Sequence, residues 1–245
     1  MTGGVAVGPD RHGRASELAA GLERVRRRVE AACAGAGRRP AELTVVVVTK
    51  TRPASDVRLL AELGVRDMGE NRDQEAAEKA AACAGLGLRW HFVGQLQTNK
   101  ARSVARYADV VHSVDRLRLV EALSRAAADA GRELRCLVQV ALPGGPGETG
   151  PRGGAAPEDV PALADAVAEA AGLTLGGVMA VAPRDEDPGA AFARLAAIAA
   201  RLRQVHPHAT DVSAGMSADL EPAVAAGATH VRVGTAVLGT RPALR

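Results

Sequence analysis

A lysine follows a run of four valines in the stretch TVVVVTKTRP, residues 44–53. The valines predict a buried strand, and Lys50 stands where that strand would reach the surface. A lysine amine in a partly desolvated site loses its proton near neutral pH and then attacks an aldehyde, forming a Schiff base. The alternative is a structural lysine whose methylene stem lies on apolar surface while its ammonium group reaches water.

Two turns of small residues near the end of the sequence each lead into a helical pattern. They are SAGMSADLE (213–221) and RVGTAV (232–237). Backbone N–H groups at a helix start attract anions, and the hydroxyls of Ser213, Ser217 and Thr235 add donors. The two turns together favour a phosphate site. The alternative is that Ser217 and Thr235 are ordinary helix caps.

Arg232 lies between two valines, so strand alternation places it on the opposite face from them. An arginine that faces the interior needs an acceptor, because an unpaired buried charge is costly. The acceptor is either a carboxylate such as Glu70 or an atom of a ligand. Lys50, the two turns and Arg232 together describe a ligand with an aldehyde, a phosphate and a ring acceptor. Pyridoxal 5′-phosphate has all three.

The elements that must position these residues alternate along the chain. Strands are predicted at 43–48, 66–69, 89–94, 109–114, 135–142, 175–182, 210–215 and 230–239. Helices are predicted at 15–35, 53–63, 71–83 and 97–107, then from a cap at Asp115 to Gly131, and at 157–171, 188–205 and 217–225. Eight such strands over this length favour a (β/α)₈ barrel. An open doubly wound sheet is disfavoured, because no glycine-rich dinucleotide fingerprint follows the first strand.

Barrels of this kind carry their sites at the C-terminal ends of the strands. We therefore expect Lys50, Glu70, Asn71, His91, Met179, Arg232 and the two turns to gather there. Barrels also frequently bind phosphate with the loops after strands seven and eight, where the two turns fall.

Composition excludes several classes of protein. Aromatic residues make up only 2% of the 245 residues, which argues against a stacking platform for single-stranded nucleic acid. The formal net charge is +3 with both signs well mixed, and the basic run RVRRRVE (24–30) favours a solvated helix face over a nucleic-acid patch.

The cysteines and the terminus bear on location. Three cysteines far apart, without a CxxC pair, predict reduced thiols and a cytoplasmic setting. Residues 1–14 are glycine-rich without an apolar segment, so we expect a disordered terminus rather than a signal peptide. No stretch is apolar enough to span a membrane.

Six stretches resemble one known family. VVTKTRP, MGENRDQE, WHFVGQLQTNK, HSVDR, GVMAVAP and SAGMSADLEPAVAAGATHVRVGTAVLG lie in this order between about residue 43 and residue 239. They resemble the pyridoxal phosphate homeostasis proteins. The resemblance implies that residues 15–245 form a single (β/α)₈ TIM barrel, like the N-terminal domain of alanine racemases. It also implies a Schiff base between Lys50 and pyridoxal phosphate.

The resemblance assigns further residues to the cofactor. Arg232 would meet the pyridine nitrogen and Asn71 would lie near the ring. The residues around the phosphate would be Ser213, Gly215, Met216, Ser217, Gly234 and Thr235. The chain departs from the family at Arg72, where an aromatic residue usually follows GEN. It departs again at PGGPGETG (143–150), which lacks the lysine of a region with a proposed secondary role in cofactor exchange.

The resemblance implies a protein that binds the cofactor and keeps its free level in balance, without clear turnover. An arginine at the pyridine nitrogen keeps that atom unprotonated, which disfavours most carbanion chemistry. Alanine racemases use a tyrosine of a partner subunit as second base, whereas the only tyrosine here, Tyr107, is expected outside the site. We therefore expect a monomeric carrier that buffers pyridoxal phosphate or delivers it to apo-enzymes. The alternative is an enzyme of the amino-acid racemase class.

Overall fold

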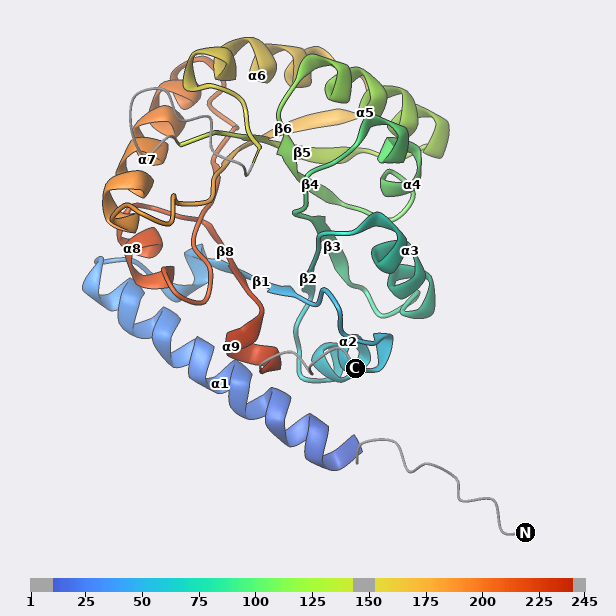
Figure 1. Cartoon of the computed structure of the whole chain (residues 1–245), viewed down its shortest axis with the longest axis vertical. Coiled ribbons are helices and arrows are strands. Elements are labelled where there is room, and N and C mark those ends of the chain that lie inside the picture. Colours follow the sequence, from blue (N-terminus) through green and yellow to red (C-terminus); the bar gives the residue numbers. More distant parts are fainter. Residues whose placement is uncertain (1–10, 143–152, 240–245) are drawn as a thin grey trace.

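Eight parallel strands close into a barrel in chain order, with β8 pairing back onto β1 (Figure 1). The computed structural model describes residues 11–142 and 153–239. The closure confirms the predicted (β/α)₈ barrel and excludes the open doubly wound sheet. The strands are β1 Thr44–Val48, β2 Asp67–Glu70, β3 Arg89–Phe92, β4 Val110–Val114, β5 Leu134–Gln139, β6 Leu173–Met179, β7 Asp211–Ser213 and β8 His230–Val233.

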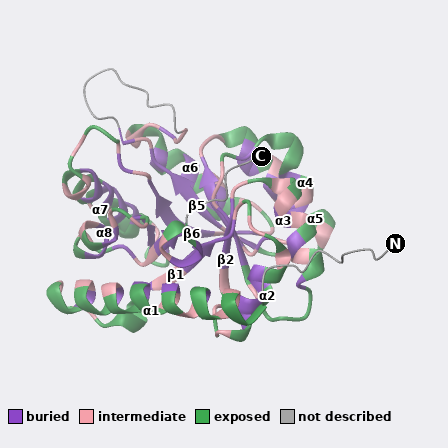
Figure 2. Ribbon diagram, turned by 60° about the horizontal axis from the view of Figure 1, so that its bottom comes forward, coloured by how far each residue is buried: buried purple, intermediate pink, exposed green. Residues whose placement is uncertain are grey.

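Helices surround the barrel and follow the predicted alternation. They are α1 Arg11–Gly35, α2 Ala54–Glu62, α3 Asp73–Ala82, α4 Ala101–Val104, α5 Leu117–Ala130, α6 Val160–Glu169, α7 Pro188–Val205, α8 Leu220–Ala225 and α9 Thr235–Leu238. Short 3₁₀ turns occupy Pro40–Glu42, Thr98–Lys100 and Pro157–Asp159. Burial follows this arrangement, since the strands at the centre are buried and the outer helix faces are exposed (Figure 2).

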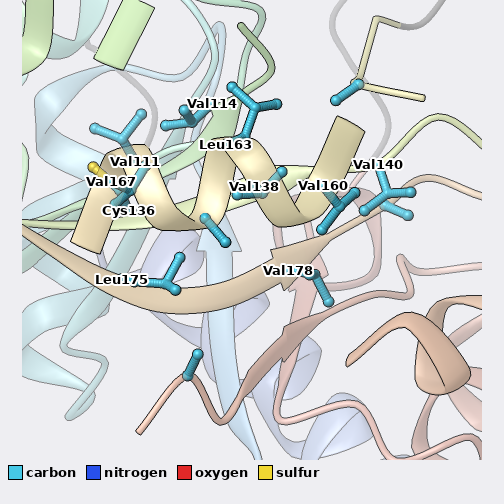
Figure 3. Close-up of a cluster of buried hydrophobic side chains, with 14 of the residues drawn as sticks. Val111, Val114, Cys136, Val138, Val140, Val160, Leu163, Val167, Leu175 and Val178 are labelled. Atoms are coloured by element: carbon cyan, nitrogen blue, oxygen red, sulfur yellow. The ribbon is translucent and has the colours of Figure 1, made fainter. Parts of the chain in front are cut away.

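The layer between barrel and helices is aliphatic. Figure 3 shows α6 lying over β5 and β6, where Val160, Leu163 and Val167 of the helix share one buried cluster with the strand residues Val138 and Val178. All five are buried. Branched side chains of this kind pack well on a pleated surface, so the core closes with very few aromatic rings.

Several predicted boundaries differ from the structure, and two of these differences have a clear physical reason. The strand expected over 230–239 ends at Val233, because the chain turns at Gly234 and the N–H groups of Val237 and Leu238 bond to the Gly234 carbonyl. Asp115 was expected to cap the helix before Gly131, but α5 has Arg116 at its N-cap position and no side-chain cap. The Asp115 carboxylate instead accepts a hydrogen bond from the Arg116 side chain.

Helix α1 is longer than expected and lies against α8 and α9 (Figure 1). It begins at Arg11, so residues 11–14 are helical and the expected disordered segment 1–14 is corrected; residues 1–10 lie outside the described residues.

Two close contacts hold α1 against the barrel. The Arg14 guanidinium donates to Asp56 at 2.6 Å and to the carbonyl of Leu238 at 3.2 Å. At Gly21 a β-carbon would come within 2.3 Å of the Val237 carbonyl oxygen, so only glycine permits this approach.

The basic run on α1 also supports one of the two candidate turns. Arg24, Arg26 and Arg27 are exposed, as expected for a solvated helix face. Arg28 is different, because it donates to the Ser217 carbonyl at 2.8 Å and to the Glu221 carboxylate. It therefore ties α1 to the turn after β7. Within the described ranges, no helix is both long and apolar enough to cross a membrane.

Candidate functional site

Lys50 lies in the turn after β1, at the C-terminal end of the barrel, and is partly exposed. The next residue, Thr51, has a φ of +64° and is the only non-glycine residue with positive φ in the part of the chain that the structure describes. This conformation is unfavourable for a β-branched residue and is typical of functional sites. The Thr51 N–H donates to the Glu75 carboxylate of α3 at 3.0 Å, which holds the turn.

A buried ion pair lies next to this turn. Lys79 Nζ donates to Glu70 Oε1 at 2.6 Å and to the Thr49 carbonyl at 2.7 Å. The Thr49 hydroxyl also donates to Glu70 Oε1, at 2.6 Å, while Glu70 Oε2 is buried without a hydrogen bond. Burial raises the pKa of Glu70 despite the hydrogen bonds from Lys79 and Thr49. The cluster fixes the end of β1 and the start of its turn.

Lys79 was missed in the sequence, although a signal for it existed. It falls on the buried stripe of α3 between Ala76 and Cys83, at helical spacing. A lysine on an apolar stripe needs a carboxylate partner, because an unpaired charge there is costly.

Arg232 faces the barrel interior, as strand alternation predicted, and is 5% exposed. It donates to Ser213 Oγ at 2.6 Å and to the Ala180 carbonyl at 2.8 Å. The alternative pairing of Arg232 with Glu70 is wrong, because Glu70 pairs with Lys79. Burial lowers the pKa of Arg232 to about 10, partly offset by the Asp219 charge, so the guanidinium remains protonated at neutral pH.

The turns after β7 and β8 contact one another. The Ser217 hydroxyl accepts from the Ala236 N–H at 3.4 Å. Gly215 has a φ of +85°, and a β-carbon there would lie 2.5 Å from the Ala223 β-carbon, so the first turn requires glycine. The helix-cap alternative is wrong for both hydroxyl residues, since the N-cap positions of α8 and α9 are Asp219 and Gly234.

All the residues expected at the cofactor come from one arc of the barrel. Strands β7, β8, β1 and β2 are consecutive neighbours, and each contributes a C-terminal end. Asn71 follows β2, and its Oδ1 atom is buried without a hydrogen bond. The remaining members are Lys50 after β1, Arg232, Gly234 and Thr235 on or after β8, and Ser213, Gly215, Met216 and Ser217 at or after β7.

Two residues expected at the mouth have side chains that fill the barrel interior. His91 is buried inside the barrel and bonds to Asp67, the first residue of β2, and to His112. Met179 is the last residue of β6, at the C-terminal end as predicted, but its side chain packs with Val110 and Leu137 in the barrel interior. The sequence did not show that these two side chains fill the interior, because this depends on register and side-chain direction.

The Ser213 hydroxyl was expected to donate to a phosphate, but it has other partners. Its oxygen is fully buried and bonds to both Arg232 and His112 Nδ1, at 2.6 and 2.9 Å. Ser213 therefore supports Arg232.

A cleft of about 530 Å³ lies beside Asn71, between α3 and the segment after β3. Phe92, Leu96, Gln95 and Lys100 contribute to its walls. Tyr107 is not part of this wall; its hydroxyl lies 3.4 Å from Asp73 on α3. The cleft gives space next to the arc of candidate residues.

Comparison with known proteins places the chain in a family. Residues 21–242 match the family described as alanine racemase, N-terminal domain. A pyridoxal phosphate homeostasis protein of Mycobacterium tuberculosis is 45% identical over 98% of both chains, and that of Escherichia coli is 38% identical over 92% of this chain and 97% of its own. The chain belongs to the family of pyridoxal phosphate homeostasis proteins.

Solved structures agree with this assignment. PipY of Synechococcus elongatus, solved with pyridoxal phosphate bound, has a TM-score of 0.77 and 35% identity, covering 91% of this chain and all of its own. A D-threonine aldolase of Filomicrobium marinum has a TM-score of 0.71 with 17% identity, and covers 95% of this chain and 64% of its own. The second likeness concerns the fold alone.

Proposed function

We propose that this protein binds pyridoxal 5′-phosphate at the barrel mouth, as a Schiff base on Lys50, and serves to buffer or deliver it. The observation that carries the proposal is the gathering of Lys50, Arg232 and the turns after β7 and β8 on one arc. The homeostasis proteins that it resembles over nearly its full length support the same role.

The residues of the arc match the functional groups of the cofactor one by one. The Lys50 amine condenses with the aldehyde and releases water. Backbone N–H groups of the two turns, at Gly215, Ser217, Gly234 and Thr235, suit the phosphate, whereas the Met216 N–H donates to the Asp219 carboxylate at 2.6 Å. Arg232 offers N–H groups to the pyridine nitrogen, and Asn71 would lie near the ring.

The charge at Arg232 favours a carrier over an enzyme. When bound, the cofactor supplies an electron sink whose strength depends on protonation of its ring nitrogen. Arg232 is a donor that stays charged, so it does not supply that proton. The two hydrogen-bond acceptors described for Arg232 are a hydroxyl and a carbonyl, and neither is an acid.

Racemisation is the second candidate, favoured by the match to the alanine racemase N-terminal domain. It requires a second base opposite Lys50, and Tyr107 is unsuited because it packs against α3 with its pKa raised by burial and by Asp73. We expect no turnover of D- or L-alanine, or of a broad amino-acid panel, by the cofactor-loaded protein. Turnover that disappears in Lys50→Ala would establish the enzyme instead.

Delivery is tested with the loaded protein and an apo-aminotransferase. We expect activity of the aminotransferase to recover on mixing, and not to recover when the cofactor has first been fixed to the carrier by borohydride, because the reduced bond cannot be hydrolysed or exchanged. Recovery at the rate at which the cofactor dissociates from the carrier into solution would favour buffering.

We further propose that the protein acts as a monomer in the cytoplasm and contacts apo-enzymes transiently. Free cysteines at all three positions support a reducing compartment.

The phosphate turn is tested with two glycines at opposite ends of α8. Gly215 and Gly227 both have positive φ, but only at Gly215 would a β-carbon meet another atom closely. Replacing either with alanine should cost about 1 kcal/mol of stability from backbone strain, and Gly215→Ala should cost more because its β-carbon would also meet Ala223. Only Gly215→Ala should also weaken cofactor binding, by about tenfold or more. Equilibrium dialysis checks this, and equal weakening in both variants would contradict it.

A further inference from the structure

An unbroken chain of hydrogen bonds runs through the barrel interior to Arg232. Arg232 Nη1 lies 2.6 Å from Ser213 Oγ, and Ser213 Oγ lies 2.9 Å from His112 Nδ1. His112 Nε2 lies 2.9 Å from His91 Nδ1, and His91 Nε2 lies 2.8 Å from Asp67 Oδ1. The chain therefore links the start of β2 to the proposed contact with the cofactor ring.

The two ends fix the direction of every bond between them. Arg232 can only donate, and an ionised Asp67 can only accept. Burial opposes ionisation of Asp67, but hydrogen bonds from His91 and Arg89 outweigh it and lower its pKa to about 2. With neutral rings, Ser213 must donate to His112 Nδ1, His112 must donate from Nε2, and His91 must donate from Nε2 to Asp67.

The reverse direction is unfavourable. It would place a proton on His112 Nδ1 and require a second proton on His91. His91 would then be a cation that is only 1% exposed, whereas the direction given above needs no charged ring. Burial, then His91 and the Arg232 charge lower the pKa of His112 well below the usual range, so His112 itself is neutral in either direction. Other charged or titratable groups surround this hydrogen-bond chain. The ring centroid of His230 lies 6.1 Å from those of His91 and His112. Arg89 pairs with Asp67, and Arg135 pairs with Asp211.

We propose that His112 is a positioning residue that sets how Arg232 presents itself to the pyridine nitrogen. By accepting the single hydroxyl proton of Ser213, His112 leaves the Ser213 oxygen as an acceptor for Arg232. The guanidinium is then held by Ser213 and Ala180, and its remaining N–H groups are left for a ligand. Asp67 supplies the negative end of the chain. This inference rests on the proposed function, in which Arg232 meets the ring.

The tautomer of His112 can be measured without the cofactor. In the wild-type protein labelled with ¹⁵N-histidine, we expect His112 to be neutral, with Nε2 protonated and Nδ1 bare, throughout pH 6–8. An Nδ1–H tautomer or an imidazolium ring in that range would overturn the inference. This result stands whether or not pyridoxal phosphate binds, so it separates failure of the inference from failure of the proposed function.

Variants then test the effect on the ring. His112→Phe keeps a ring in the site but removes the acceptor, and His112→Asn keeps an acceptor near the Nδ1 position. His230→Phe is the matched control. The ring of His230 lies beside those of His91 and His112, but it bonds to Thr229 and is not a member of the hydrogen-bond chain. The readouts are the signal of ¹⁵N-labelled pyridoxal phosphate at its ring nitrogen, the dissociation constant and borohydride trapping at Lys50.

For His112→Phe we expect a shifted ring-nitrogen signal and affinity weakened about tenfold, with trapping at Lys50 retained. His112→Asn and His230→Phe should resemble wild type. An unchanged signal in His112→Phe, or the same shift in all three variants, would overturn the inference. If His112→Phe does not fold, the wild-type tautomer and the His112→Asn signal still decide.

Discussion

Lys50→Ala is expected to bind no cofactor covalently while keeping the fold. Alanine has no amine to condense with the aldehyde, whereas the phosphate turns and Arg232 are unchanged. Because Lys50 is partly exposed in a turn, stability should change by less than about 1 kcal/mol. The visible absorption that wild type gains on addition of pyridoxal phosphate should be absent, and the dissociation constant should rise by about 100-fold or more.

Lys100→Ala is the matched control for this change. Lys100 is an exposed lysine of the cleft beside Asn71 and lies 3.9 Å from Asp73. Its removal should leave the absorption intact. If Lys100→Ala loses the absorption and Lys50→Ala keeps it, the attachment point has been assigned to the wrong lysine.

Lys79→Met is expected to lower the free energy of unfolding by about 3–5 kcal/mol, because it leaves the buried Glu70 carboxylate without its cation. Methionine fills a similar volume, so the loss comes from the uncompensated charge rather than from a cavity. Urea denaturation measures it. Arg72→Met, which removes an exposed partner of Glu75, is the control and should cost less than about 1 kcal/mol.

The destabilisation should depend on pH in a defined direction. Burial already raises the pKa of Glu70 in the folded protein, and loss of Lys79 raises it further. A carboxyl group whose pKa is higher when folded binds more protons in the folded state, so stability falls as pH rises from the unfolded to the folded value. The deficit of Lys79→Met should therefore shrink as pH is lowered from 7 towards 5. A deficit that is constant over this range would contradict the role assigned to the pair.

The barrel was predictable from sequence because its signals are local and repeated. Runs such as the valines of β1, glycines at helix ends such as Gly131, and the regular alternation of strands and helices each specify one element. The grouping of Lys50 with Arg232 and the two turns then follows, since parallel strands present their C-terminal ends on one face.

Partners across the barrel were not predictable, because they depend on register and side-chain direction. Arg232 pairs with Ser213 rather than with Glu70, because its side chain extends towards the neighbouring strand β7, where it meets Ser213 and the carbonyl of Ala180, which follows β6. His91 lies inside the barrel because it aligns with Val110, the first residue of β4, and its ring reaches Asp67 at the start of β2. The residues after Gly234 were consistent both with a strand over 230–239 and with a helix start at RVGTAV, and the structure has the helix α9.

Borohydride reduction of the wild-type protein loaded with pyridoxal phosphate, followed by peptide mass spectrometry, tests the central claim most directly. The sequence contains only three lysines, Lys50, Lys79 and Lys100, so the outcome is unambiguous. The account predicts one reduced pyridoxyl group per chain, on the peptide that contains Lys50. Label on Lys79 or Lys100 in its place, or no label at all, would contradict it.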